Sequence, residues 1–501
     1  MSILLKDKKK VIIIGGGTAG LTIAYQLQDH FNIVVIEKSK YKKYPFFIYK
    51  IPLLGGLLFS KKKYISTINF NFYDRNIPFF ESNFLGGASV INGCVHTIGN
   101  STLWDYVLKP FDLSYKDVLS SFNKLYSLNE NNNNKISITK TPQNIIDKAF
   151  IKALNNQKVP CGDMNFSNNE ICGPILVTSG KYFRSSVLSL LDRKIFKVLT
   201  AQKVEKINFN EDGKVTGVST DLKTINADYV ISASGVIGSC DLLLKTKNIE
   251  KENKKNFLDD VSIGKDIIDH TNLRIKVIAN RKFNSLNELS HSFFKKLLIV
   301  FKHFSGNSTL LKTTGASSAA YLDLDDDGEI DTKIQLLQFT ESGRLGSDGS
   351  KSLFDSQPGF SIAITLINPK SRGEITLGDS KCNVNPNYLS SKKDINLLIT
   401  ALKYSLDLLR SEAISPYVLK IINEGEIENN PEQFIFDNIY SGYHLVGGTQ
   451  DAIDKDFKVK KTENLYVCDA SVFKEHVASN SHSSVIVIAD IFSTKFINKN
   501  Y

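Results

Sequence analysis

The sequence has few cysteines and no closely spaced pair of them. Its 501 residues include six, at Cys94, Cys161, Cys172, Cys240, Cys382 and Cys468, and none belongs to a CxxC motif. This spacing argues against a zinc site, a redox dithiol and a disulfide scaffold. We therefore expect six free thiols and no metal centre, and a disulfide reductase is disfavoured.

Long apolar runs are also missing. No stretch of about eighteen apolar residues occurs, so we expect no transmembrane helix. At the N-terminus the charges follow a short apolar patch that passes directly into a strand, the wrong order for a secretory signal. These features favour a cytoplasmic protein. Residues 44–64, YPFFIYKIPLLGGLLFSKKKY, are apolar with basic flanks and could contact a membrane peripherally. Because Pro52 and two glycines break this segment, we expect it to line a cavity or an interface instead.

Acidic residues are outnumbered, and the formal net charge is +10. The excess lysine is spread along the chain rather than gathered in one basic helix, which favours a solvated surface over a nucleic-acid site. An anionic substrate or surface partner stays open. With 42% hydrophobic and 23% charged residues, the composition is that of a globular protein. The length allows two or three domains or one large two-part enzyme, and no internal repeat is visible.

The clearest motif lies in residues 9–39, KKVIIIGGGTAGLTIAYQLQDHFNIVVIEKS. An apolar strand ends in Gly15, Gly17 and Gly20 at GxGxxG spacing, a helix-like stretch follows, and a second strand ends at Glu37. The glycines permit a tight turn, close approach to a pyrophosphate and close helix packing. The helix N-terminus at Thr18 and Ala19 supplies N–H groups for phosphate, and Glu37 can accept ribose hydroxyls. This unit indicates FAD or NAD without separating them.

Further pieces suit the same kind of domain. The segment FLGGASVINGCVHTIGN (84–100) has adjacent glycines that could lie against a flat ring or a phosphate. Residues 196–245 alternate like a meander of strands and end in a buried strand and a helix. Near the C-terminus, ENLYVCDASVF is another buried strand that leads to Asp469, and a helix is expected from Ser484 onward.

The order of these pieces resembles the glucose-methanol-choline (GMC) family of FAD-dependent oxidoreductases over nearly the whole chain. GGASVINGCV is similar to the first family signature, and SASGVIGSCDLLL is similar to the second. FRSSVLSLL, VSIGKDIIDH, NPKSRGEITLGDS, NPNYLSSKKDINLL and YHLVGGT match further motifs in the expected order.

The resemblance implies an α/β fold. It has a discontinuous Rossmann-like FAD-binding domain and an α+β substrate domain built on an antiparallel sheet. By this analogy the FAD domain comprises residues 1–45, 77–105, 186–270 and 440–501, and the substrate domain residues 46–76, 106–185 and 271–439. The expected cofactor contacts are then Gly86, Gly87, Ser89, Asn92, Gly93, Val204, Ser234, Gly235, Asp469 and Ala470, in addition to those of residues 15–37.

Family members place a histidine and a second His or Asn over the flavin. The resemblance assigns these positions to His444 and to Asn480, which lies eleven residues after Asp469. A neutral imidazole suits proton removal from an alcohol, and a neighbouring amide can orient the same oxygen. His482 is a further candidate, expected to support the pair. Both His444 and Asn480 could instead be structural. His476 and His96 are expected to be bystanders, and His270 to bond locally.

The sequence departs from the family pattern at Ser481, where proline is usual, and at residues 447–453. These changes leave the substrate less defined than the cofactor. Because Ile91 stands where some relatives carry a flavin-linked histidine, we expect non-covalent FAD. The expected activity is oxidation of a small-molecule alcohol, such as a sugar or polyol, with an unknown electron acceptor. A lyase with structural FAD or a non-enzymatic flavoprotein is the alternative. DLDDDGEID (323–331) is similar to a calcium loop but lacks its twelfth-position Glu, so we expect an acidic turn between strands.

Overall fold

The computed structural model describes residues 8–127, 135–191, 195–253, 258–280, 283–341, 354–378 and 381–501. One layer is a five-stranded sheet with the order β11-β2-β1-β15-β26. All neighbouring strands in it run parallel. The strands are β1 (Lys10–Ile14), β2 (Asn32–Glu37), β11 (Lys197–Thr200), β15 (Tyr229–Ser232) and β26 (Leu465–Val467). This sheet is therefore assembled from the beginning, the middle and the end of the chain.

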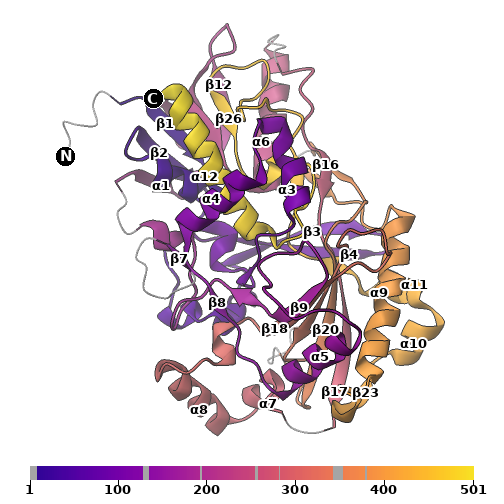
Figure 1. Ribbon diagram of the computed structural model, residues 1–501. Coiled ribbons are helices and arrows are strands. Elements are labelled where there is room, and N and C mark those ends of the chain that lie inside the picture. The colour runs from indigo at the N-terminus through magenta and orange to yellow at the C-terminus, as the bar shows by residue number, and fades with distance from the viewer. Residues whose placement is uncertain are drawn as a thin grey trace.

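The parallel sheet is covered by helices from equally distant segments. Helix α1 (Thr18–Leu27) connects β1 to β2, and α12 (Ser481–Asn500) packs against α1. Figure 1 shows α12 beside α4 (Tyr115–Leu125), with which it is also in contact. Four of the five residues of β1 are buried, as expected for a strand that is covered on both faces. The C-terminal helix thus completes the layer that the N-terminal motif begins.

A seven-stranded antiparallel sheet forms the second large layer, in the order β23-β17-β20-β19-β18-β9, with β24 also paired to β17. Its strands are β9 (Ile171–Pro174), β17 (Thr271–Ala279), β18 (Ala316–Leu322), β19 (Thr332–Leu337), β20 (Gly359–Leu366), β23 (Val418–Ile421) and β24 (Tyr440–Ser441). The helices α5 (Ile145–Asn156), α9 (Lys392–Arg410) and α11 (Pro431–Asn438) pack against it, and Figure 1 shows α9 and α11 together along one side.

The alternation of side chains in this sheet sets up the site described below. Ile334 and Leu336 of β19 are buried in the core beneath the helices. Because successive strand residues point to opposite faces, Lys333 and Gln335 point to the other face. A lysine is thereby directed away from the helices and into the interior of the molecule.

Smaller sheets connect the two layers. The predicted meander is present as β12 (Val204–Phe209), β13 (Val215–Thr220) and β14 (Thr224–Asn226). A four-stranded sheet contains β16 (Lys265–Ile268), β21 (Gly373–Thr376), β22 (Asn383–Asn385) and β25 (Val446–Gly448), and β3 (Ile65–Phe72) pairs with β4 (Arg75–Ser82). Short pairs are formed by β5 (Val95–His96), β8 (Thr139–Lys140) and β10 (Leu176–Val177), and by β6 (Tyr126–Ser127) and β7 (Ile136–Ser137).

The remaining α-helices are short apart from α6 (Gly235–Glu252), which follows β15. They are α2 (Pro52–Gly55), α3 (Ser101–Leu108), α7 (Leu286–Ser290), α8 (Phe293–Phe304) and α10 (Glu424–Asn429). A parallel sheet with covering helices beside an antiparallel sheet confirms the predicted fold class. The predicted domain boundaries stay a prediction. In addition, α12 begins at Ser481, three residues before the predicted start.

The segment 44–64 is broken into short turns, as Pro52 and its glycines indicated. It forms 3₁₀ turns at Phe47–Lys50 and Gly56–Leu58 on either side of α2. At its start, Phe46 and Phe47 are each 65% exposed, so these two side chains line no cavity of the isolated chain, and the expectation of an interface stays a prediction. In the described part of the chain, no helix combines the length and apolar character needed to cross a membrane.

Candidate active site

The N-terminal glycine motif forms a tight turn at the carboxyl end of β1. Gly15 has a φ of +102°, a conformation that favours glycine. A Cβ on Gly20 would lie 1.9 Å from the carbonyl oxygen of Gly15, so only glycine fits there. Gly17 precedes α1 without a side-chain cap, and the first turn, with Thr18 and Ala19, contains no acidic residue. The N–H groups of this helix end can therefore receive phosphate oxygens.

Glu37 lies beside this turn and is buried. One of its carboxylate oxygens accepts a hydrogen bond from the backbone N–H of Gly16 at 2.5 Å, and the other accepts one from Ser39 at 2.7 Å. Each oxygen has a second lone pair. The acid that ends β2 is thus fixed next to the glycine turn, where it can accept ribose hydroxyls.

The second glycine-rich segment meets the first. The N–H of Gly86 donates to the carbonyl of Gly16 at 2.7 Å, and a Cβ on Gly87 would lie 2.9 Å from the Cα of Gly17. The Ser89 hydroxyl donates back to Gly86 at 2.7 Å. Two sequence-distant backbones therefore approach closely, as a shared dinucleotide cradle requires.

Asn92 and Gly93 continue this segment away from the cradle. The side-chain oxygen of Asn92 accepts hydrogen bonds from the backbone N–H of Cys94 and from Arg184. Ile91, which precedes Asn92, is 8% exposed and has no nucleophilic atom to attach to a flavin.

A third group of predicted cofactor residues lies where β15 and β26 end. Asp469 accepts hydrogen bonds from the N–H of Gly235 at 2.9 Å and from the Ser239 hydroxyl at 2.6 Å, which places a carboxylate at the N-terminus of α6. The Ser234 hydroxyl donates to the carbonyl of Ile14. Ala470 begins the turn after Asp469. Most of the predicted cofactor residues thus gather at one edge of the parallel sheet.

Val204 is a predicted cofactor residue that is not shown to lie at this edge of the parallel sheet. It is buried at the start of β12, and no contact described for it joins the glycine turns. The uncapped helix end, the two facing glycine segments and Glu37 together fit a dinucleotide cofactor such as FAD.

His444 and Asn480 are brought together from different elements. His444 precedes β25, and Asn480 is the residue immediately before α12. The amide nitrogen of Asn480 lies 3.0 Å from His444 Nε2. Both residues are half-buried. Burial and then the charge of Lys333 lower the pKa of His444 to about 3, so the imidazole is neutral at physiological pH.

A chain of hydrogen bonds extends from both sides of this pair. Lys333 Nζ donates to Asn480 Oδ1 at 3.1 Å. On the other side, His444 Nδ1 lies 3.0 Å from His270 Nδ1, and His270 Nε2 lies 3.2 Å from the carbonyl oxygen of Ile367.

The two ends of the chain determine the direction of every bond in it. A carbonyl only accepts, so His270 must donate from Nε2, and its neutral Nδ1 must accept from His444 Nδ1. His444 then keeps its lone pair on Nε2. At the other end, an ammonium only donates, so the oxygen of Asn480 faces Lys333 and its NH₂ faces His444. The fold therefore presents an acceptor nitrogen on His444 beside a donor amide on Asn480.

Lys333 was not among the residues that the sequence singled out. It is 4% exposed, and no carboxylate of the described residues forms an ion pair with it. Its ammonium also lies 5.5 Å from the ring centre of Tyr321. Burial lowers the pKa of Lys333 to about 7. The sequence does show a lysine within the apolar strand TKIQLL, which could have suggested a buried charge. Nothing in that pattern indicated that its partner is Asn480.

One expectation about histidines is wrong. His270 was expected to bond locally, yet it contacts His444 and Ile367. His476 lies against His270 with ring centres 3.7 Å apart, and its expected place outside the chemistry stays a prediction. Burial lowers the pKa of both rings well below the usual value. The site therefore contains a cluster of three neutral imidazoles.

Asp269 holds the loop that carries His444. It accepts hydrogen bonds from the hydroxyls of Tyr388 and Ser441, both at 2.5 Å, and from the backbone N–H of His444 at 2.9 Å. Burial raises the pKa of Asp269, and these hydrogen bonds oppose that rise. The carboxylate thus fixes the backbone on which the imidazole sits.

His482 is not part of this chain of hydrogen bonds in the described structure. No hydrogen bond joins it to His444 or Asn480 in the described structure, and its Nε2 is buried without a partner. Burial and then the charge of Arg184 lower its pKa to about 4. A supporting role for His482 stays a prediction. His96 is also buried, with its ring against Phe122 and Tyr126.

The acidic stretch 323–331 lies between β18 and β19, which confirms the predicted turn. Asp323, Asp325 and Asp327 bring carboxylate oxygens within 4.8 Å of one another. Lys393 Nζ lies 2.8 Å from Asp325 and 3.0 Å from Asp327. An ammonium group therefore already neutralises part of this cluster.

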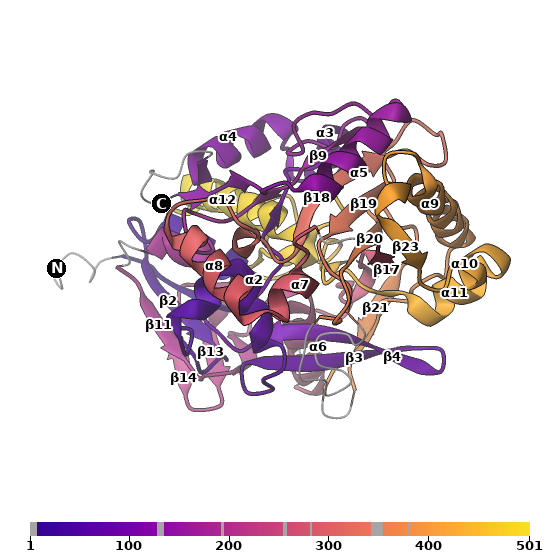
Figure 2. The ribbon, with the colours of Figure 1, turned by 90° about the horizontal axis from the view of Figure 1, so that it is seen from below.

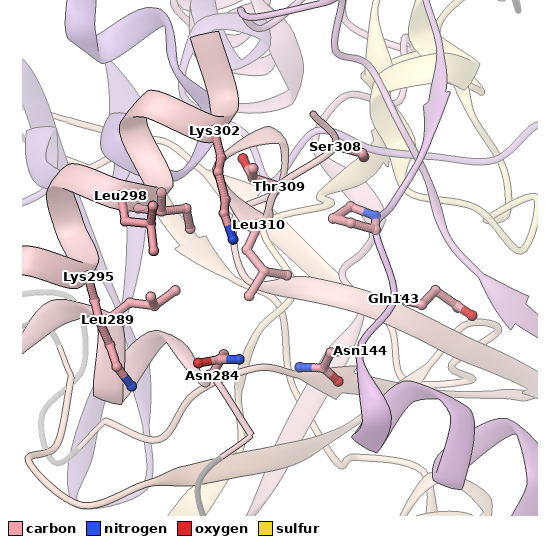
Figure 3. Close-up of a pocket in the computed structure, with 12 residues that line it drawn as sticks. Gln143, Asn144, Asn284, Leu289, Lys295, Leu298, Lys302, Ser308, Thr309 and Leu310 are labelled. Atoms are coloured by element: carbon pink, nitrogen blue, oxygen red, sulfur yellow. The ribbon is translucent and has the colours of Figure 1, made fainter. Parts of the chain in front are cut away.

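A pocket of about 300 Å³ lies away from these residues. Figure 3 shows it between α8, represented by Leu298 and Lys302, and the segment of Gln143 and Asn144. Neither His444 nor Asn480 lines it. The chemistry described above therefore does not belong to this pocket.

Comparison with known proteins gives matches over nearly the whole chain. Residues 9–272 and 369–489 match the N- and C-terminal models of the GMC oxidoreductases. The chain is 24% identical to an oxygen-dependent choline dehydrogenase of Staphylococcus saprophyticus, over 97% of this chain and 94% of that protein. It is 23% identical to a pyranose dehydrogenase of Agaricus campestris, over 98% and 93%. A crystal structure of formate oxidase superposes with a TM-score of 0.85 at 16% identity, over 99% of both chains.

Proposed function

The chain belongs to the GMC oxidoreductase family, and from this premise we propose that it oxidises a small-molecule alcohol to the carbonyl compound with FAD as hydride acceptor. The observation that carries the proposal is the orientation of the His444–Asn480 pair. One partner offers a lone pair and the other a proton, 3.0 Å apart.

The pair matches the needs of an alcohol hydroxyl. In the structure the amide of Asn480 donates directly to His444 Nε2. A substrate hydroxyl that replaces this bond accepts a hydrogen bond from the amide of Asn480 and donates its own proton to His444 Nε2. Because His444 is neutral, it can act as the general base that removes this proton. Asn480 holds the oxygen while charge develops on it, and it limits the orientations of the reacting carbon.

FAD, when bound, supplies the capacity to accept the hydride that leaves the carbon. The residues proposed to hold it are the glycine turns at Gly15–Gly20 and Gly86–Gly87, together with Glu37 and the end of β26. Since Ile91 offers no nucleophile, non-covalent binding is proposed.

Lys333 and His270 are proposed as positioning residues in this reaction. Lys333 prevents the Asn480 amide from flipping, and its charge lies one side chain away from the developing negative charge. His270 keeps the proton of His444 on Nδ1. Neither needs to touch the substrate to have this effect.

The relatives named above act on choline and on pyranoses, and a sugar or polyol is our proposed substrate class. The electron acceptor is open between oxygen, a quinone and a protein. The six free thiols of the structure are in keeping with a reducing compartment, and we propose a cytoplasmic location.

The proposal is tested by following the flavin spectrum anaerobically while pools of alcohols and sugars are added. Bleaching by one pool supports alcohol oxidation, and the rate of recovery in air separates an oxidase from a dehydrogenase. Release of a carbonyl compound without bleaching would support a lyase instead. A purified protein without flavin would contradict the proposed cofactor site.

His444→Ala provides the residue-level test. Removal of the general base should lower kcat by about 100-fold or more, while the flavin spectrum of the variant stays that of the native protein. His291→Ala, at an exposed histidine, is the matched control. Equal kcat in His444→Ala and the native enzyme would exclude His444 as the base.

A further inference from the structure

Helix α8 presents its apolar side chains to solvent. Its sequence is FFKKLLIVFKHF, and the large residues are exposed by 69% at Phe293, 82% at Phe294, 54% at Leu297, 52% at Leu298 and 70% at Phe301. Helices of globular proteins ordinarily bury such a face. Apolar patches of this kind on a protein surface mark a site of interaction.

The helix is attached to the protein largely by its polar residues. His303 is fully buried and lies within hydrogen-bonding distance of the Tyr182 carbonyl and the Thr309 hydroxyl. Lys295 forms an ion pair with Glu288 at 3.2 Å. Beneath the helix lies the pocket of Figure 3, with Leu298 at its wall. The apolar face therefore has little protein packed against it.

A second exposed apolar segment lies next to this helix. α2 packs against the 3₁₀ turn Leu310–Lys312, which follows α8 and also contacts it. Figure 2 shows α8 and α2 near one another on the side turned to the viewer. Phe46, Phe47 and Leu57, which flank α2, are exposed by 65%, 65% and 40%. The two segments can therefore contribute to one surface.

The charged residues of these two segments are all basic. Residues 41–64 and 292–312 together contain ten lysines, at positions 42, 43, 50, 61, 62, 63, 295, 296, 302 and 312, and no aspartate or glutamate. Of these, Lys312 is buried and Lys295 is paired with Glu288 of the neighbouring helix α7, so the others supply the positive charge of the surface. The whole chain, by contrast, has 52 acidic residues against 62 basic ones. Exposed phenylalanine and leucine among lysines are the features of segments that lie in the interface of an anionic bilayer.

We propose that α8 and residues 46–57 form a docking surface for a membrane that contains anionic phospholipids. The phenylalanine and leucine side chains enter the boundary between headgroups and acyl chains, and the lysines contact lipid phosphates. The chain lies on the membrane and does not cross it. This proposal is independent of the catalytic one, because no residue of the His444 site takes part.

The test is co-sedimentation of the flavin-loaded protein with vesicles of phosphatidylcholine alone and of phosphatidylcholine mixed with phosphatidylserine. The mixed vesicles should bind the protein more tightly, and added salt should weaken that binding. The double variant Phe294→Ser/Phe301→Ser should lose about 100-fold in partition, since each buried phenylalanine contributes roughly 10-fold. Lys296→Glu/Lys302→Glu should lose about 5-fold for each lost lysine charge.

Leu419→Ser is the matched control, because Leu419 is 66% exposed on β23, outside the surface. It should bind vesicles as the native protein does. Insertion itself is read from Phe294→Trp. The single native tryptophan, Trp104, is fully buried, so a blue shift on adding mixed vesicles reports the new residue.

Absence of binding to both kinds of vesicle would overturn the proposal, as would unchanged binding by the phenylalanine double variant. Gel filtration with light scattering tests whether the surface binds a second copy of the chain instead of a membrane. A native dimer that Phe294→Ser/Phe301→Ser converts to monomer, without any vesicle binding, would assign the surface to a second copy of the chain. The flavin bleaching assay, run on the same variants, is expected to be unchanged.

Discussion

At the scale of single residues, the notable group is the ammonium of Lys333. A buried lysine without a carboxylate partner is costly, because burial disfavours its charged form. Within the described ranges, its one hydrogen-bond acceptor is the amide oxygen of Asn480. The cost of burying this charge is therefore linked to the orientation of Asn480. Through Asn480, it is also linked to the position of His444 Nε2. This position is in keeping with a role in catalysis rather than in stability.

Lys333→Met should lower kcat by about 10-fold or more, because the Asn480 amide loses the donor that orients it. The pH profile gives a second readout. Since the pKa of Lys333 is lowered to about 7, its charge is lost as the pH rises through 7, and kcat of the native enzyme should decline there. The Met variant should lack this decline.

Lys276→Met is the control for that variant. Lys276 lies in β17 of the same sheet. Thr365 of the strand between them pairs with Lys333 on one side and with Asn272 of β17 on the other. Lys276 is four residues further along β17 than Asn272. Four strand residues span about 13 Å, so this substitution should leave both kcat and the pH profile unchanged. An alkaline decline that is identical in Lys333→Met and the native enzyme would assign it to another group.

At the scale of elements, the cofactor cradle depends on how closely α1 approaches the end of β1. Gly20 sits in the first turn of α1, and the backbone oxygen of Gly15 occupies the place of its missing side chain. The same contact sets the position of the helix N-terminus, which is the proposed phosphate site. Cofactor binding and local packing are therefore coupled through one glycine.

Gly20→Ala should displace α1, lower the FAD affinity by 10-fold or more and destabilise the protein by about 1–3 kcal/mol. The measurements are flavin fluorescence during titration with FAD and urea unfolding of the apoprotein. Gly56→Ala is the matched control, because a Cβ on helical Gly56 would meet no atom within 4 Å. Equal FAD affinity in the two variants would contradict the predicted coupling.

At the scale of the whole molecule, buried neutral histidines should make the protein sensitive to acid. His96, His270 and His476 are each at most 2% exposed, and burial lowers the pKa of all three. Below pH 6.5 the unfolded chain binds protons that these folded rings do not. The free energy of unfolding should therefore fall as the pH falls, by about 1 kcal/mol for each ring between pH 6.5 and 5.5 and by about 1.4 kcal/mol per unit at lower pH.

The measurement is urea unfolding between pH 6.5 and 5.5 for the native protein and for His96→Phe. Because neither ring nitrogen of His96 has a hydrogen-bond partner among the described residues and the ring packs on aromatic side chains, phenylalanine fits this site. The variant should reduce the loss of stability over this interval by about 1 kcal/mol. His291→Gln, at an exposed position, should not alter it, and an unchanged slope in His96→Phe would contradict the prediction.

Features that depend on neighbouring residues could be predicted from the amino-acid sequence. The glycine turn, α1 and Glu37 follow from local spacing and steric limits, and the acidic turn at 323–331 follows from turn chemistry. The resemblance to the GMC family placed His444 and Asn480 at candidate positions. It did so without indicating which nitrogen of His444 is free.

The surroundings of that pair could not be predicted, because they depend on how distant segments pack. Lys333, His270 and Ile367 come from three different parts of the chain, and their alignment depends on strand pairing and helix packing over more than 30 residues. Likewise, the exposure of α8 cannot be read from its sequence, because an apolar helix with lysines is equally suited to a buried position. The physical reason is the same in both cases. Local sequence specifies which groups an element carries, whereas long-range packing determines which groups they meet.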